Sequence, residues 1–232
     1  MIATFSEDRC IDHLALDRDA LQSRGWANCS LTLGSTIELN EQVLRLARQL
    51  GEPVATRVGG EVLQKLCPTR ARMAKPRSLS WKYGVGEFPF HTDTAHWLMP
   101  CRYIVLACLA PGEGRRPTYL LDTMELPITD GDRVLLCSSP IRVANGRNSF
   151  FSTILSSSRP FTRYDPGCMT PVMTDGVRAM NVFSKTRWTE YVEEIQWMPG
   201  KATVIDNWRV LHGRGASDCP DTDRTLLRVS IR

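Results

Sequence analysis

Residues 202–214, ATVIDNWRVLHGR, carry the clearest structural pattern in the chain. The first four are small or branched and mostly apolar, which is typical of a buried β-strand. The strand runs into Asp206 and Asn207, and a short turn then presents His212 before a glycine. Taken alone, this histidine is either a packed core residue or a general base.

Short runs of the same kind follow one another through the rest of the chain. Residues 26–33 read as a strand, and 39–50 as an amphipathic helix that Gly51 and Pro53 terminate. Many short strands after one or two helices predict a mainly β (α+β) protein, a sandwich or barrel with helices on one side. Pro-Gly or Asp-Gly turns at 111–112, 130–131 and 199–200 help to delimit further strands, predicted at 102–110, 118–121, 133–138, 201–206 and 225–231.

Length and composition favour one globular domain over 1–232. With 232 residues, 42% of them apolar and 23% charged, the chain is too apolar for a disordered protein and can bury a core. The longest uncharged apolar run, 103–110, falls far short of the roughly 20 residues of a membrane helix. The N-terminal MIATFSEDR lacks the features of a signal peptide. We therefore expect a soluble, cytoplasmic protein with no membrane partner.

Cysteine usage and charge exclude two further classes of protein. The eight cysteines, Cys10 among them, form no CxxC pair and are too sparse for a disulfide scaffold, so reduced thiols are expected. The 29 basic and 25 acidic residues leave a net charge of +4, and no basic run exceeds two residues. A nucleic-acid partner is therefore not expected.

A long loop is predicted over 145–175, which is rich in Ser, Pro, Gly and Asn. Loops of this length are often active-site lids, and a linker is the alternative.

A possible binding pair lies in residues 87–93, EFPFHTD. If this segment is extended, Glu87, His91 and Asp93 share one face and the two phenylalanines share the other. An imidazole beside a carboxylate inside a β-structure is unfavourable unless something binds them. The alternative is an exposed strand with a solvated pair, since HxD often arises by chance.

His91, Asp93 and His212 together supply two imidazoles and one carboxylate. Such a set holds non-haem Fe(II) and leaves positions open for a co-substrate and O₂. Zinc with a water as fourth ligand suits the same groups, so the ligands alone do not choose the metal. His96 is expected in the pocket wall and His13 in packing, rather than among the ligands.

The C-terminal residues 223–232, DRTLLRVSIR, split into two faces if they form a strand. Thr225, Leu227 and Val229 lie on the apolar face, and Arg224 and Arg228 lie on the other. The arginine face is either a basic solvent face or an inward one. In the second case a guanidinium can bind a carboxylate through two parallel hydrogen bonds.

Three segments, HTD at 91–93, IDNWRVLHGR at 205–214 and RTLLRVSI at 224–231, together resemble the TauD/TfdA (clavaminate synthase-like) family of Fe(II)/2-oxoglutarate-dependent dioxygenases. The resemblance implies a double-stranded β-helix (jelly-roll) core with helices packed on one face. It implies Fe(II) on His91, Asp93 and His212. It also implies 2-oxoglutarate with its distal carboxylate on Arg224 and Thr118.

The resemblance further implies a reaction in which O₂ and 2-oxoglutarate are consumed, succinate and CO₂ are released, and a C–H bond is hydroxylated. Arg228 matches a position that contacts an anionic substrate group in some relatives, and Glu87 is a candidate partner for a substrate ammonium. We therefore expect a small polar substrate, anionic or zwitterionic, such as an amino acid or a related biosynthetic intermediate. A salt bridge to an arginine is the alternative for Glu87.

Other outcomes of the same chemistry stay open at this stage. They are desaturation or cyclisation, an oxygenase that acts on nucleic acid or protein, and a non-catalytic metal-binding jelly roll. Halogenation is not expected, because Asp93 retains the carboxylate that the family's halogenases lack.

Overall fold

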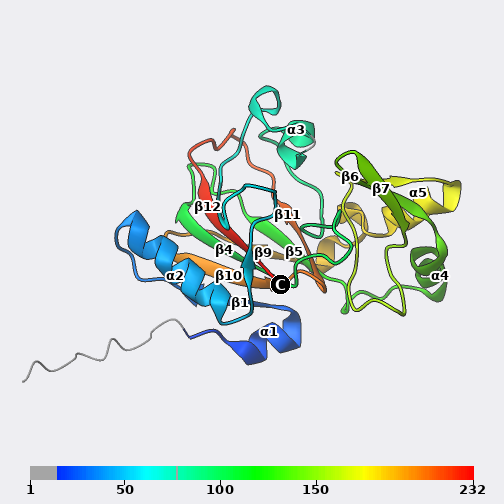
Figure 1. The fold of residues 1–232 in the computed structure, drawn as a ribbon, viewed down its shortest axis with the longest axis horizontal. Helices are drawn as coiled ribbons and strands as arrows, with labels where there is room; N and C mark the ends of the chain where they lie inside the picture. Colours follow the sequence, from blue (N-terminus) through cyan, green and yellow to red (C-terminus); the bar gives the residue numbers. More distant parts are fainter. Residues whose placement is uncertain (1–14, 77) are drawn as a thin grey trace, which may run out of the picture.

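The computed structural model of the protein describes residues 15–76 and 78–232, and it is mostly β with a few helices (Figure 1). All strand pairs that it contains are antiparallel, and they form three sheets. The expected mainly β class with several helices is confirmed. His13, which was expected in packing, and Cys10, which was expected as a reduced thiol, lie outside the described residues.

The largest sheet contains most of the predicted strands. Its order is β1-β10-β4-β12-β2, and β3 also pairs with β12. β10, β4 and β12 begin or end within one residue of their predicted bounds, because their apolar runs are buried inside the sheet. The strands of this sheet are β1 (Trp26–Ser30), β2 (Pro53–Val54), β3 (Leu63–Leu66), β4 (Tyr103–Ala110), β10 (Lys201–Asp206) and β12 (Thr225–Ile231).

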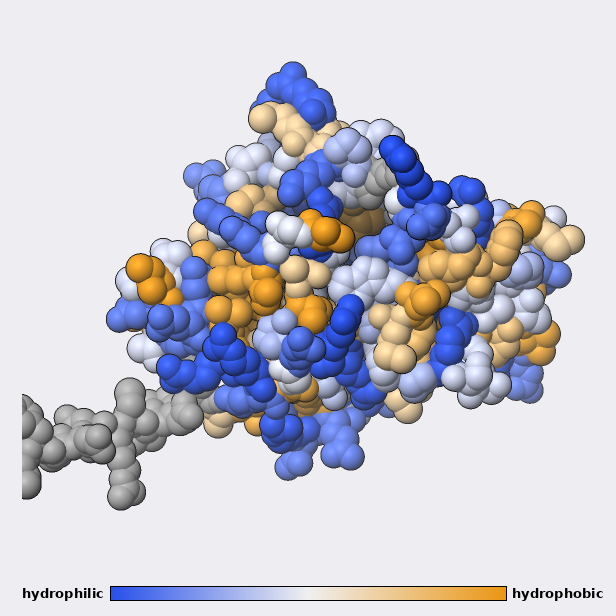
Figure 2. Space-filling view, in the orientation of Figure 1, coloured by the Kyte–Doolittle hydropathy of each residue, from blue (hydrophilic) through white to orange (hydrophobic). Residues whose placement is uncertain are grey.

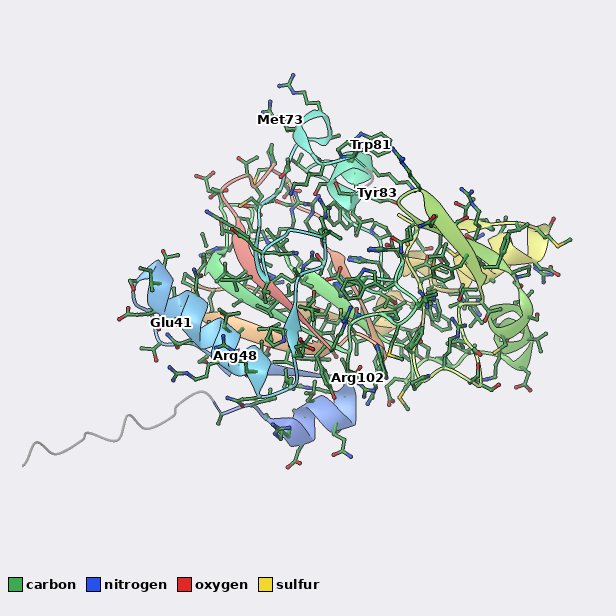
Figure 3. The ribbon with its side chains drawn as sticks, in the orientation of Figure 1. Glu41, Arg48, Met73, Trp81, Tyr83 and Arg102 are labelled. Carbon is green, nitrogen blue, oxygen red and sulfur yellow. The ribbon has the colours of Figure 1, made fainter. Side chains whose placement is uncertain are left out.

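Two helices, α1 (Arg18–Arg24) and α2 (Thr36–Arg48), pack against this sheet. The buried face of α2, including Val43 and Leu46, joins a core cluster with residues of β4, β10 and β12. Its opposite face carries Glu41 and Arg48, which project outward (Figure 3). The helix begins three residues before the predicted start because Ser35 and Glu38 form a capping box.

A smaller sheet, β11-β5-β9, faces the large one. It is built from β5 (Thr118–Asp122), β9 (Val192–Ile195) and β11 (Val210–Arg214). A second core cluster joins the two sheets, since it includes Leu106 and Ile205 of the large sheet and Leu120, Ile195 and Val210 of the small one. The β10–β11 connection, residues 207–209, therefore passes from one sheet to the other.

The third sheet, β7-β6-β8, lies beside the other two with two helices, α4 and α5 (Figure 1). The strand predicted at 133–138 is wrong, as is the turn at 130–131, because both lie in α4. Thr129 caps this helix by accepting a hydrogen bond from the Asp132 amide, and the helical turn buries Leu136 completely. The elements are α4 (Asp130–Ser138), β6 (Ile141–Asn145), β7 (Asn148–Ser152), β8 (Met169–Pro171) and α5 (Thr174–Val182).

The remaining helical elements are short. Two of them, η1 and α3, lie between β3 and β4 in the chain. They are η1 (Ala71–Met73), α3 (Leu79–Tyr83), η2 (Lys185–Arg187) and η3 (Thr189–Tyr191). Met73 and Trp81 project outward from η1 and α3 (Figure 3).

Two observations on the described part of the chain concern its cysteines and its helices. The seven cysteines within it are free, and three of them are buried. None of its helices combines the length and apolar character needed to cross a membrane. On the face shown in Figure 2, hydrophilic and hydrophobic residues are interspersed.

Leu46→Ala should lower the free energy of unfolding by about 2–5 kcal/mol, because Leu46 is fully buried and its loss leaves a cavity under α2. Ile37 lies on the same helix and is 70% exposed. Ile37→Ala should therefore change stability by less than about 0.5 kcal/mol. Urea unfolding of both variants checks this, and equal losses would contradict the packing of α2.

Candidate active site

The two histidines of the predicted set lie opposite each other on paired backbones. The segment 88–91 is extended and runs antiparallel to β11: the amides of Phe88 and His91 donate to the carbonyls of Arg214 and His212, both at 2.9 Å. The His212 amide returns a bond to the His91 carbonyl at 3.1 Å. This pairing brings the two imidazole rings to 4.3 Å between centroids.

Gly213 permits this close approach of the two backbones. A Cβ atom at this position would lie 2.8 Å from the carbonyl oxygen of Phe88, a contact with backbone that a side chain does not relieve. Glycine is therefore required after His212 because the two backbone segments lie so close together. The φ angle of Gly213 is not in the left-handed region.

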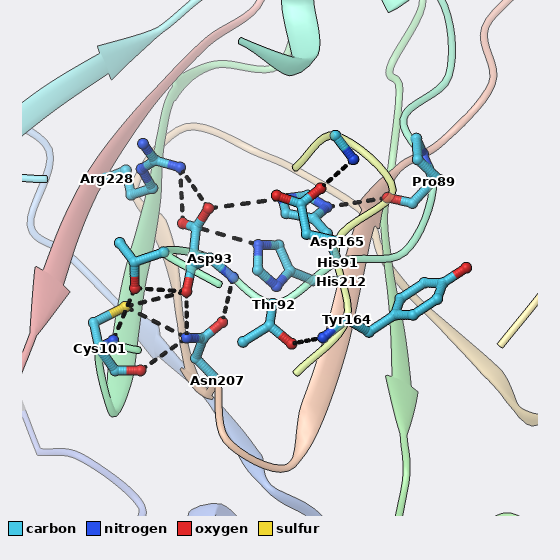
Figure 4. Close-up of polar contacts among 12 residues, drawn as sticks. Pro89, His91, Thr92, Asp93, Cys101, Tyr164, Asp165, Asn207, His212 and Arg228 are labelled. Carbon is cyan, nitrogen blue, oxygen red and sulfur yellow. Dashed lines mark hydrogen bonds and ion pairs between the residues drawn. The ribbon is translucent and has the colours of Figure 1, made fainter. Parts of the chain in front are cut away.

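His91, Asp93 and His212 form a compact buried group (Figure 4). One ligand atom from each residue lies within 4.8 Å of the other two. Nε2 of His91 is 3.7 Å from one Asp93 oxygen, and Nε2 of His212 is 4.0 Å from the other. All three residues are at most 7% exposed, so water competes little for these atoms.

The chemistry of the donor set fits a divalent metal ion. Nδ1 of His91 is 3.0 Å from the Pro89 carbonyl, an acceptor, so this nitrogen donates a proton there, and Nε2, which faces Asp93, is the nitrogen available to a metal ion. Metal-binding histidines are oriented by such bonds. Burial and the neighbouring His91 lower the pKa of His212 to about 3, so its imidazole is neutral at pH 7.

The carboxylate of Asp93 supplies the negative charge of the group. Burial opposes ionisation of Asp93, but Arg228 and the two histidines outweigh it and hold the pKa well below its ordinary value. Burial likewise opposes protonation of His91, and Asp93 outweighs it and raises the pKa of this imidazole. A divalent cation between these groups would be attracted by the same carboxylate.

Arg228 is bound to Asp93 rather than free in a pocket. Its Nη1 donates to both carboxylate oxygens, at 2.9 and 2.7 Å, while Nε and Nη2 donate to Oε1 of Gln64. Gln64 stands opposite Arg228 in the β3–β12 pairing, and its own amide donates to Thr56. The predicted contact of Arg228 with substrate stays a prediction, and in this structure the guanidinium already bonds two side chains, Asp93 and Gln64.

The structure brings together Arg224 and Thr118, the residues predicted to bind 2-oxoglutarate. Nη2 of Arg224 donates to the Thr118 hydroxyl at 3.3 Å, and Trp197 donates to the same oxygen at 3.0 Å. Arg224 is 4% exposed, and burial lowers its pKa to about 10. Its Nε has no hydrogen-bond partner within the described part of the chain.

Positive charge exceeds negative charge around Arg224. Two more buried arginines, Arg116 and Arg214, repel one another and Arg224, and Asp221 is the buried carboxylate beside them. Arg116 donates to the carbonyls of Gly215 and Cys219, whereas Arg214 donates to those of Gly84 and Gly86. Arg224 makes one such bond, to Thr118, so it has more donor capacity left for an anion than the other two arginines.

Sequence reasoning missed two residues that line or support the site. Asp165, in the predicted loop, interacts electrostatically with His91 and Asp93, and burial raises its pKa (Figure 4). Arg163 is 1% exposed and donates to the carbonyls of Trp97 and Leu98, beyond the Asp93 turn. Loop composition carries no signal for either contact, because each joins segments far apart in the chain.

Glu87 and His96 lie outside the three-residue group. Glu87 is exposed and contributes to the lining of a small, mostly apolar cavity of about 250 Å³, together with Tyr83, Phe88, Pro89, Phe90 and Tyr119. The predicted role of Glu87 toward a substrate ammonium stays a prediction. His96 is half-buried, and burial lowers its pKa.

Two histidines and one carboxylate that converge in this way are the ligand set typical of non-haem Fe(II) oxygenases. The family model of the taurine catabolism dioxygenase TauD, TfdA family matches residues 133–230. The match includes His212, Arg224 and Arg228, whereas His91 and Asp93 precede it. It confirms the resemblance and the enzyme class predicted from the sequence, a 2-oxoglutarate-dependent dioxygenase. No curated protein matches the chain.

Solved structures of oxygenases share the fold. Asparagine oxygenase, in complex with Fe(II), 2S,3S-3-hydroxyasparagine and succinate, aligns with a TM-score of 0.73 at 18% identity, over 92% of this chain and 77% of that one. The non-heme iron oxygenase OrfP, in complex with Fe and alpha-ketoglutaric acid, aligns with a TM-score of 0.65 at 21% identity, over 87% and 69%. The groups bound in these relatives agree with the cofactors expected from the sequence.

Gly213→Ala should weaken binding of a divalent metal by about tenfold or more, because the added methyl pushes the 88–91 backbone, and with it His91, away from His212. Gly131→Ala is the control. Gly131 lies in α4, and an added Cβ has no contact shorter than 3.9 Å. Titration of both metal-free variants with Mn(II) checks this, and equal affinities would show that the glycine is not required.

Proposed function

We propose that this 2-oxoglutarate-dependent dioxygenase hydroxylates a C–H bond of a small amino-acid-like substrate. The observation that carries the proposal is the buried group of His91, Asp93 and His212, with its ligand atoms within 4.8 Å of one another. The buried Arg224–Thr118 pair supports it, because a keto acid bound to the metal needs an anion receptor of this kind for its second carboxylate.

In this proposal Fe(II) is held by Nε2 of His91, Nε2 of His212 and one oxygen of Asp93. Bound Fe(II), O₂ and 2-oxoglutarate supply the oxidising chemistry, and the protein supplies position and charge. The Pro89 carbonyl orients His91, and Arg228 holds the Asp93 carboxylate. Three protein ligands leave positions for the co-substrate and O₂.

The 2-oxoglutarate site is proposed at the arginine cluster. Arg224 would donate to the distal carboxylate, and the Thr118 hydroxyl, held by Trp197, would support the same group. The surplus positive charge around Arg224 favours a bound anion, because Arg116 and Arg214 are committed to carbonyls. Removing the anion would leave this charge buried without compensation.

For the substrate we propose an amino acid, with Asp165 as the partner of its cationic group. Asp165 is partly buried beside His91 and Asp93, and a carboxylate there is stabilised when a cation binds. Asparagine oxygenase and OrfP have been solved in complex with a hydroxylated asparagine and a hydroxylated arginine, respectively. Arg228 would take part only by exchanging one of its present bonds for the substrate carboxylate.

Three further features belong to the proposal. The two facing sheets would be the halves of a double-stranded β-helix, within a single domain over 1–232. Residues 161–164 of the predicted lid segment are buried and the segment contains β7 and β8, so only its exposed stretches, such as 145–149, would be available to close over a substrate. A cytoplasmic location and the lack of a nucleic-acid partner stay predictions.

Arg224→Ala should raise the dissociation constant for 2-oxoglutarate by about 10–100-fold, since it removes a charged hydrogen-bond donor. The measurement is an anaerobic visible spectrum. A weak charge-transfer band should appear in the wild-type protein only with both Fe(II) and 2-oxoglutarate.

The control for this spectrum is Arg133→Ala, on the exposed side of α4, which should retain the wild-type band. An unchanged band in Arg224→Ala would remove Arg224 from the 2-oxoglutarate site. A wild-type protein that retains zinc or manganese and gives no band would contradict the proposed chemistry.

Asp165→Asn should raise KM for an amino-acid substrate about tenfold or more and leave the 2-oxoglutarate dissociation constant within twofold, because it removes the charge but keeps the shape. Succinate release with a panel of free L-amino acids, including asparagine and arginine, identifies the substrate. A product heavier by one oxygen atom marks hydroxylation. A panel in which no amino acid increases succinate release would contradict the substrate class.

A further inference from the structure

We propose that Asn207 is the positioning residue that holds Asp93 in its metal-binding geometry. Its side-chain amide bonds both backbone groups of Asp93: Oδ1 accepts from the Asp93 amide at 2.8 Å, and Nδ2 donates to the Asp93 carbonyl at 3.1 Å. Nδ2 also donates to the Cys101 carbonyl at 2.8 Å. One side chain thus imitates a β-ladder partner for Asp93 (Figure 4).

The backbone next to Asp93 needs such support. Thr94 has a φ of 57°, in the left-handed region that β-branched residues rarely adopt. Its hydroxyl donates to the Asp93 carbonyl at 2.6 Å and accepts from the Cys101 amide at 2.8 Å. The Asp93–Thr94 peptide is therefore held in an unfavourable conformation by bonds from Thr94 and Asn207.

The location of Asn207 gives these bonds a function beyond local stability. Asn207 is fully buried in the connection between β10 and β11, five residues before His212. It therefore ties the segment that carries Asp93 to the segment that carries His212, although 114 residues separate Asn207 from Asp93. The distance between the two ligands depends on this tie and on the His91–His212 pairing.

An asparagine is the suitable residue at this position. The site offers one donor, the Asp93 amide, and two acceptors, the carbonyls of Asp93 and Cys101. Only an amide presents an acceptor and two donors on so short a side chain. An aspartate would accept from the Asp93 amide, but its second oxygen would face the two carbonyls.

The inference rests on the proposed metal site, and Mn(II) titration of the metal-free protein in the absence of O₂ tests it. Asn207→Ala and the isosteric Asn207→Asp should each lower Mn(II) affinity by about 10–100-fold, the range for residues that orient a metal ligand. Two variants are used so that the aspartate variant decides if the alanine variant does not fold.

The control is Thr203→Val on β10. Thr203 is fully buried, and its hydroxyl donates to Asn28 at 2.8 Å, so this variant loses a side-chain hydrogen bond on the strand that leads to Asn207 without contacting Asp93. Its melting temperature should fall, while its Mn(II) affinity stays within twofold of wild type. A merely structural role of Asn207 would lower the melting temperature in the same way and leave Mn(II) affinity unchanged.

The outcomes separate this inference from the proposed function. A wild-type protein that binds no Mn(II), or binds it equally well as His91→Ala, would overturn the metal site and the inference with it. Tight binding that His91→Ala abolishes, with folded Asn207 variants that bind as the wild type does, would overturn the inference alone. Weak binding by the Asn207 variants and normal binding by Thr203→Val would establish it.

Discussion

The structure depends on one constraint, the burial of the Asp93 carboxylate. A buried charge without partners is strongly unfavourable, and the surrounding residues are arranged to compensate it. Arg228 donates to both oxygens, and His91 and His212 face them at 3.7 and 4.0 Å. The same arrangement creates a place where a divalent cation is attracted and three ligand atoms converge.

A second imbalance of charge lies around Arg224, the residue proposed to bind 2-oxoglutarate. Arg116, Arg214 and Arg224 are buried around Asp221, so positive charge is in excess there. Near Asp93 the compensation of a negative charge favours a cation, and near Arg224 the surplus positive charge favours an anion. In the proposed function, a divalent metal ion would meet the first requirement and the distal carboxylate of 2-oxoglutarate would meet the second.

Local sequence predicted four strands closely, β4, β5, β10 and β12, but it took the helix α4 for a strand. β12 coincides with the predicted 225–231 because apolar and polar residues alternate along most of it, with Leu226 as the exception. Residues 133–138 were misassigned because Val134, Leu135 and Leu136 form a short apolar run that periodicity cannot attribute to a strand or a helix. The cap at Thr129 decided the matter, and it lies before the run that suggested a strand.

The sequence by itself determined the residues proposed for the site and their order: His91, Asp93 and His212 stand out as a ligand set, and the family resemblance adds Thr118 and Arg224. Tertiary structure alone decided the partners of these residues. Arg228 binds Asp93 and Gln64, Asn207 holds the Asp93 backbone, and Arg163 ties the loop after Asp93. The physical reason is that these contacts join residues 66 to 164 positions apart, which periodicity and local propensity do not relate.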